Sequence, residues 1–168
     1  MSLSDTLRHL ETTGFRDLAG ARVTAAVPIS ERLVNELVAA SLPPNLPVRD
    51  VSIRPEANNQ LSVRIMPRTG WLPPMTVTLE IVQQPDFPRS PVLALQMKTK
   101  GGLLGLASTM LPIANMLPPG VRLEDKRILV DLHEIAAQRG FDHLLQHLTR
   151  LTVTSESGRI VLHLEAGA

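Results

Sequence analysis

The middle of the chain alternates apolar and polar side chains with a period of two residues. The alternation runs through four successive stretches, separated by turns that contain Pro, Asn or Asp, at 51–54, 61–65, 75–81 and 93–98. Because neighbouring side chains of a strand point to opposite faces, each stretch predicts a strand with one apolar and one polar face. Together the four stretches predict an antiparallel sheet whose apolar face lies against a core.

An amphipathic helix is predicted between a short strand at 22–27 and this sheet. Ser30 is a typical N-cap, and the carboxylate of Glu31 suits the positive end of a helix dipole. The apolar residues of this helix share one face, and they are Leu33, Val34, Leu37 and Val38. The Pro43-Pro44 pair predicts the end of the helix.

Shorter elements are predicted in the C-terminal third. They are two strands, a helix that ends before Gly140, a second helix that begins at Asp142 and extends through Leu148, and a closing hairpin. We expect the two strands at 121–123 and 128–130, the first helix at 132–138, and the hairpin between 151–153 and 160–164 across Glu156-Ser157-Gly158.

Chain length and element order predict a single α+β domain. The 168 residues are enough for one well-supported hydrophobic core, and no repeat or long linker divides them. We expect a helical N-terminal extension at 1–21. The core at 22–165 is expected to be a strongly curved antiparallel sheet wrapped against helices.

The apolar residues are mostly aliphatic. Leu, Ile and Val account for 49 of the 168 residues, whereas Phe, Trp and Tyr account for four. Because large rings usually fill wide interior space, their scarcity leaves an interior of adaptable shape. The five internal Met residues all lie between positions 66 and 116, and Met fills irregular apolar sites. This clustering indicates either an apolar groove or ordinary core filling.

A stretch without charge, residues 101–121, follows the fourth predicted strand. Gly residues precede Leu103–Leu117, Pro118-Pro119-Gly120 follows it, and Pro112 interrupts it. Only 11 of the 21 side chains are apolar, so the stretch does not predict a transmembrane helix. We expect a central core helix, a gate over a cavity, or an element that dips into a membrane surface.

Composition narrows the classes of partner. The absence of Cys excludes disulfides, thiolate metal sites and cysteine nucleophiles. A net charge of +1 and four aromatic residues argue against nucleic acid as a partner. From Arg49 to Lys100 there are seven positive and four negative residues. Such an excess favours either a solvated outer sheet face or contact with phospholipid headgroups or another phosphate-bearing partner.

Candidate catalytic and metal-binding residues are few. His143 and His147 are four residues apart on the second C-terminal helix, with Asp131, His133 and Glu134 upstream. A hydrolytic zinc site needs two such His, a third ligand and a carboxylate base, but the residue after His143 is Leu where the metalloprotease motif has Glu. The motifs of serine hydrolases, phosphate-binding loops and dinucleotide-binding turns are absent. We expect no enzyme, no metal and no cofactor, with a metal-dependent hydrolase as a third alternative.

The predicted elements follow one another in a distinctive order. They are the strand Val23–Val27, the helix at 29–37, the alternating strands from Val51 to Met97 and the final hairpin. This order, from Arg22 to Glu165, resembles that of the tubular lipid-binding superfamily, to which bactericidal/permeability-increasing protein belongs. In that family a strongly curved antiparallel sheet wraps a helix and encloses an aliphatic channel, so the resemblance implies a lipid ligand. The small bacterial members are mostly exported or lipid-anchored, and this chain shows neither signal.

The sequence therefore predicts a non-enzymatic protein that binds a lipid or other apolar ligand in an aliphatic groove, with a membrane surface as a further partner. The predicted lining consists of Leu61, Val63, Ile65, Met75, Val77, Leu79, Ile81, Leu93, Leu95, Met97, Leu103, Leu106, Met110 and Met116. The alternative is a protein–protein adaptor or a homo-oligomer that buries 101–121. Without a recognisable signal peptide we expect a cytoplasmic protein, or a periplasmic one if a leader was removed.

Overall fold

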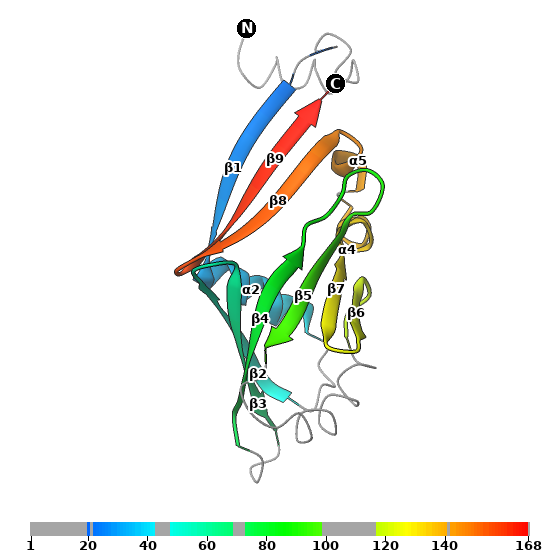
Figure 1. The fold of residues 1–168 in the computed structure, drawn as a ribbon. Helices are drawn as coiled ribbons and strands as arrows, with labels where there is room; N and C mark the ends of the chain where they lie inside the picture. The colour runs from blue at the N-terminus through cyan, green and yellow to red at the C-terminus, as the bar shows by residue number, and fades with distance from the viewer. Residues whose placement is uncertain are drawn as a thin grey trace, which may run out of the picture.

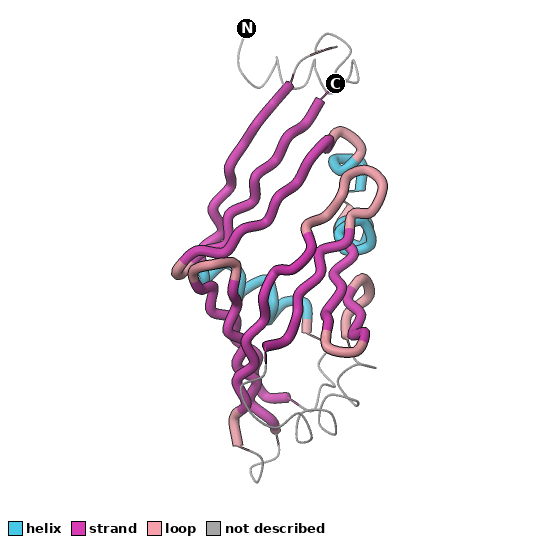
Figure 2. The backbone as a smooth tube through the Cα atoms, in the orientation of Figure 1, coloured by secondary structure: helices cyan, strands magenta, loops and turns pink. Residues whose placement is uncertain are grey.

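Strands dominate the architecture. The computed structural model describes Gly20 and residues 22–42, 48–68, 73–98, 117–140 and 142–167. Within these residues, nine strands form two antiparallel sheets (Figures 1 and 2). The predicted helical extension at 1–21 and most of the uncharged stretch fall outside the described residues.

The larger sheet has six strands in the order β2-β3-β4-β5-β7-β6 and curls into a half-barrel (Figure 1). Its first four strands are the four that the alternating pattern predicts. The bounds are Val48–Glu56 for β2, Gln60–Pro67 for β3, Met75–Gln83 for β4, Val92–Lys98 for β5, Val121–Glu124 for β6 and Arg127–Asp131 for β7.

The smaller sheet has three strands in the order β1-β9-β8: β1 (Arg22–Ser30), β8 (Leu148–Glu156) and β9 (Arg159–Gly167). The predicted C-terminal hairpin is confirmed, because Leu151 pairs with Leu164 across β8 and β9. The turn of this hairpin joins the larger sheet, where the Gly158 N–H donates to the Pro55 carbonyl at 3.0 Å.

Helix α2 (Glu31–Ser41) links β1 to the larger sheet and lies behind β4 and β5 in Figure 1. It begins as predicted, since the Ser30 side chain accepts a hydrogen bond from the Leu33 N–H at 3.3 Å. Helix α4 (Leu132–Gln138) is also confirmed. Its cap is Asp131, whose Oδ1 accepts from the N–H groups of His133 and Glu134 at 3.0 and 3.1 Å.

Helix α5 is shorter than the sequence predicts. It spans only Asp142–Leu145, and Leu148, expected to be its last apolar residue, is the first residue of β8 and pairs with Ala166. The His147 carbonyl accepts from the Gly167 N–H at 3.0 Å. The backbone thus finds hydrogen-bond partners in β9. A further helical turn would have to replace these hydrogen bonds.

The main core cluster joins the two sheets. Its buried members come from β3, β4, β5, β8 and the loop between β4 and β5, and they are Leu61, Val77, Leu79, Ile81, Phe87, Leu93, Leu95, Leu151 and Val153. The prediction of a curved antiparallel sheet is therefore confirmed in its general form. Within the described part of the chain, no helix has the length and apolar character needed to cross a bilayer.

Candidate ligand groove

The concave face of the larger sheet is built from the inward positions of neighbouring strands. Val63 of β3 pairs with Ile53 of β2 and with Val77 of β4. Two residues further along β4, Leu79 pairs with Leu61 of β3 and with Met97 of β5. Because directly paired residues of an antiparallel sheet share a face, these side chains form a continuous aliphatic surface.

A hollow of about 290 Å³ lies on this concave face. Ligand sites of proteins usually enclose about 300–1,000 Å³, so its size is at the lower end of that range. All described lining residues are apolar and non-aromatic, and they are Val38, Leu42, Val48, Val51, Ile53, Val63, Ile65, Val77, Leu79, Leu95, Met97, Leu117, Pro118, Val121, Leu123, Ile128 and Val130.

The structure distributes the predicted lining residues over three environments. Six of them line the hollow: Val63, Ile65, Val77, Leu79, Leu95 and Met97. Leu61, Ile81 and Leu93 are buried in the main core cluster, and Met75 is half-buried at the start of β4; none of these four is among the described lining residues. Leu103, Leu106, Met110 and Met116 lie outside the described residues.

Sequence reasoning missed the lining residues from α2, β2, β6 and β7. Val38 belongs to the apolar face predicted for the helix, and Val121 and Leu123 alternate with polar residues in the predicted strand. These periodicities identify inward positions. They do not reveal that β7 pairs with β5 and β6 pairs with β7, which brings both strands to the same concave face.

Asn35 holds α2 at the border of the hollow. Its side-chain amide donates to the Ile53 carbonyl at 2.8 Å and accepts from the Ile53 N–H at 2.7 Å. The amide thereby satisfies both backbone groups of an edge strand, as a neighbouring strand would. Val38 and Leu42, one turn and two turns further along the chain, are thus held against β2 and complete one wall of the hollow.

Chemistry inside the hollow is limited to apolar contact. No described lining residue carries a hydroxyl, an amide or a charge. Charged side chains next to the lining point outward, as the Lys98–Glu80 ion pair at 2.7 Å illustrates on the opposite face of the sheet. The hollow can therefore accept apolar groups, and its described walls offer no catalytic group.

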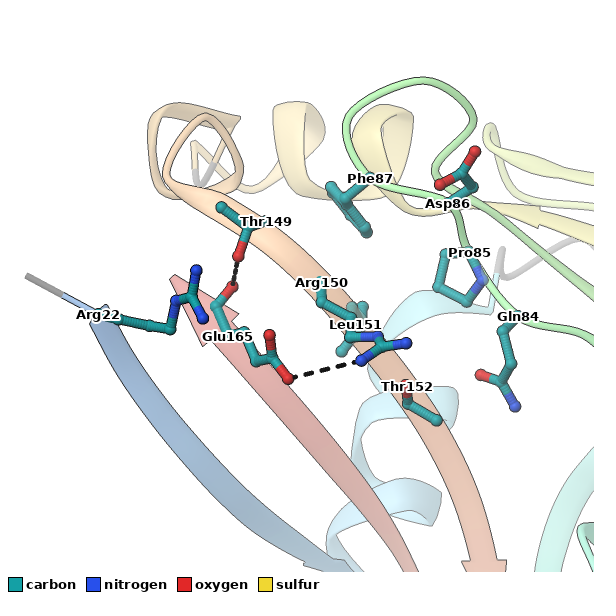
Figure 3. Close-up of a pocket in the computed structure, with 10 residues that line it drawn as sticks. All are labelled: Arg22, Gln84, Pro85, Asp86, Phe87, Thr149, Arg150, Leu151, Thr152 and Glu165. Carbon is teal, nitrogen blue, oxygen red and sulfur yellow. Dashed lines mark hydrogen bonds and ion pairs between the residues drawn. The ribbon is translucent and has the colours of Figure 1, made fainter. Parts of the chain in front are cut away.

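A second hollow, of about 580 Å³, lies where the smaller sheet faces the β4–β5 loop (Figure 3). Its walls are mainly polar, and they include Arg22, Gln84, Asp86, Arg150 and Glu165. Arg150 and Glu165 form an ion pair at 3.8 Å, although the Arg150 side chain is 71% exposed. Such an open and charge-balanced depression favours bound water over an apolar ligand.

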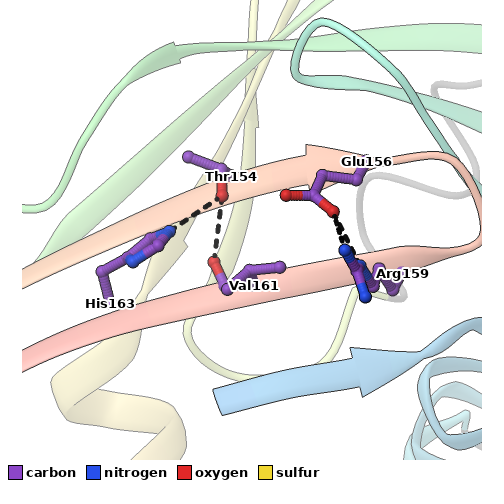
Figure 4. A network of polar contacts seen from close by, with 5 residues as sticks. All are labelled: Thr154, Glu156, Arg159, Val161 and His163. Carbon is purple, nitrogen blue, oxygen red and sulfur yellow. Dashed lines mark hydrogen bonds and ion pairs between the residues drawn. The ribbon is translucent and has the colours of Figure 1, made fainter. Parts of the chain in front are cut away.

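The exposed face of the smaller sheet carries a polar network (Figure 4). The Thr154 hydroxyl lies 3.3 Å from His163 Nε2 and donates to the Val161 carbonyl at 3.4 Å. Arg159 Nε donates to the Glu156 carboxylate at 2.7 Å. These contacts join β8 to β9 on the surface and surround no cavity.

The prediction that His143 and His147 lie four residues apart on one helix is wrong. Helix α5 ends at Leu145, so His147 is not one helical turn beyond His143. Among the described residues, no group of three or more His, Asp and Glu side chains is placed to hold a metal ion.

Comparison with protein-family models, with curated proteins and with solved structures found no match for this chain. The resemblance to the tubular lipid-binding superfamily therefore remains a prediction. The described fold places this protein in the class of proteins with a curled antiparallel sheet and a helix at the concave side of that sheet.

Proposed function

We propose that this protein binds one acyl chain, or an apolar ligand of similar width, in the hollow on the concave face of the larger sheet, without chemical turnover. The observation that carries the proposal is the composition of the walls, since the described lining residues are all apolar. A hollow with polar walls fills readily with water, whereas an apolar one provides no hydrogen bonds to water and favours apolar occupants.

The position of the hollow supports the proposal. Where the smaller sheet approaches the larger one, the concave side is filled by Phe87, Leu151 and Val153, so the hollow is local. Its walls come from α2 on one side and from the β6–β7 hairpin on the other. A tubular lipid-binding fold and contact with a membrane surface belong to the same proposal, because a curled sheet with a helix at its concave side suits both.

Chain length is the first test. Each methylene buried in an apolar site contributes about 0.8 kcal/mol, so affinity for saturated fatty acids should rise about fourfold per added methylene until the hollow is filled. Titration calorimetry with a homologous series measures this slope, and mass spectrometry of a solvent extract identifies any lipid that purifies with the protein. An affinity that does not depend on chain length would refute the proposal.

A matched pair of variants on α2 locates the site. Val38→Phe fills the hollow from the helix side and should abolish binding of the optimal fatty acid. Leu37→Phe adds a ring to the neighbouring residue, which is 42% exposed and does not belong to the described lining, and should leave binding unchanged. Equal affinity in both variants, with unchanged circular dichroism, would place the ligand elsewhere.

A further inference from the structure

The four edge strands of the two sheets differ in how well they are protected from pairing with another strand. An open edge exposes backbone N–H and C=O groups to which another strand can bind, and proteins usually shorten or cover such edges. In this protein the edges are β2 and β6 of the larger sheet and β1 and β8 of the smaller sheet. Three of them are short or covered by side chains, whereas β1 is neither in the described residues.

The β2 and β8 edges are covered by side-chain amides. Asn35 satisfies both backbone groups of Ile53 in β2. Gln84 does the same for β8: its Nε2 donates to the Val153 carbonyl at 2.8 Å, and its Oε1 accepts from the Val153 N–H at 2.8 Å. Two residues further along, the Ser155 N–H donates to Asn59 Oδ1 at 3.1 Å. The β6 edge is only four residues long.

The β1 edge is nine residues long and carries exposed apolar side chains. Val23 and Val27 are 58% and 41% exposed, and no residue from Val23 to Ser30 is charged. Both valines share the face of the sheet on which Leu162 and Leu164 of β9 pack against the core cluster. In the described residues this edge is long, has no covering amide and carries no charge from Val23 to Ser30, and Pro28 is its one residue without an N–H to donate. The rest of the edge therefore suits a paired strand.

We propose that β1 pairs in antiparallel register with β1 of a second copy of this chain, about a two-fold axis at Ala26. This register places Val23 opposite Ile29 of the second copy and Ala25 opposite Val27 of the second copy. Both pairs then lie on the apolar face, and the two small sheets become one six-stranded sheet with a continuous apolar surface.

Charge complementarity favours this register. Arg22, at one end of β1, lies opposite Ser30 of the second copy and therefore beside Glu31 of the second copy. Neither Arg22 nor Glu31 takes part in an ion pair within the described residues. A shift by one residue would set the apolar face of one copy beside the polar face of the other. A shift by two would place Arg22 opposite Arg32 or opposite Pro28 of the second copy, which either opposes like charges or moves Arg22 away from Glu31. In the proposed register Pro28 lies opposite Thr24 of the second copy, and this pair lacks the hydrogen bond that a proline cannot donate.

Sedimentation and light scattering over a wide range of protein concentration test the proposal on the full chain. The chain should dimerise, and Val27→Lys should make it monomeric because it puts a charge on the paired edge. Val82→Lys is the matched control, since Val82 is a 45% exposed valine on β4 and should not affect dimerisation.

Charge reversal tests the register. Arg22→Glu and Glu31→Arg should each weaken dimerisation about tenfold, because each alters two symmetric ion pairs, and the double variant should restore it. A chain that is monomeric at every protein concentration overturns the proposal. Dimerisation that is equally strong in both charge-reversal variants and in the unmodified chain also overturns it. A monomer that dimerises only after residues 1–19 are deleted also overturns it, because those residues would then occupy the edge. The mass readout is independent of ligand binding, so this inference and the proposed function fail separately.

Discussion

The concave side of the larger sheet is filled where β8 and the β4–β5 loop approach it, and hollow where α2 and the β6–β7 hairpin flank it. Where β8 lies near the β4–β5 loop, Phe87 packs with Leu151 and Val153, and all three side chains are buried. Where α2 and the β6–β7 hairpin flank the larger sheet, the described lining contains no aromatic ring and a hollow of about 290 Å³ remains. The difference shows that apolar composition alone does not fill a core, because width must be matched by side-chain volume.

The largest expected effect tests the filled end. Phe87→Ala removes the one aromatic side chain of the core cluster and should lower the free energy of unfolding by about 3–5 kcal/mol. Urea denaturation measures the loss. The fatty-acid affinity of the folded variant should be unchanged, because Phe87 is not among the described residues that line the hollow. A loss of affinity without a loss of stability would contradict the division into two ends.

A smaller effect is expected from the two amides that cover the sheet edges. Asn35→Ala removes three hydrogen bonds to backbone groups and Gln84→Ala removes two, and each should lower the free energy of unfolding by about 1–3 kcal/mol. Only Asn35→Ala should also weaken fatty-acid binding, because Asn35 holds the α2 wall against Ile53. Calorimetry on both variants decides this, and an unchanged affinity in Asn35→Ala would mean that the α2 wall does not depend on Asn35.

The smallest effect is expected for Val63→Ile, in a comparison that adds one methylene at each end. Val153→Ile enlarges a side chain in the filled end and should cost about 1–3 kcal/mol, because there is no space for the extra atom. Val63→Ile adds the same atom to the wall of the hollow and should leave stability within about 0.5 kcal/mol. Thermal unfolding of the two variants compares them directly. Equal destabilisation would show that the hollow is as tightly packed as the rest.

Local pattern was sufficient for most elements. The four central strands, α2 with its Ser30 cap, α4 and the final hairpin follow from periodicity and capping, which act between residues close in sequence. The prediction that the second C-terminal helix extends through Leu148 was wrong, because Leu148 pairs with Ala166 of β9. Nothing local distinguishes an apolar residue that continues a helix from one that begins a strand.

The candidate site could be predicted only in part. Val63, Val77 and Leu79 were identified as inward-facing from their alternation, and they do line the hollow. Leu61 and Leu93 have the same phase and belong to the same core cluster as Val77 and Leu79, but they are not among the described residues that line the hollow. Alternation assigns a face to a residue and carries no information about which part of that face stays open.

The sequence by itself determined the type and order of the elements, since these depend on interactions between residues a few positions apart. Tertiary structure alone decided that the strands divide into two sheets, where the hollow remains, and which edges are covered. Asn35 finds its backbone partners 18 residues away and Gln84 finds its own 69 residues away. Contacts at such separations depend on how the whole chain packs, and the residues that make them have no local signature.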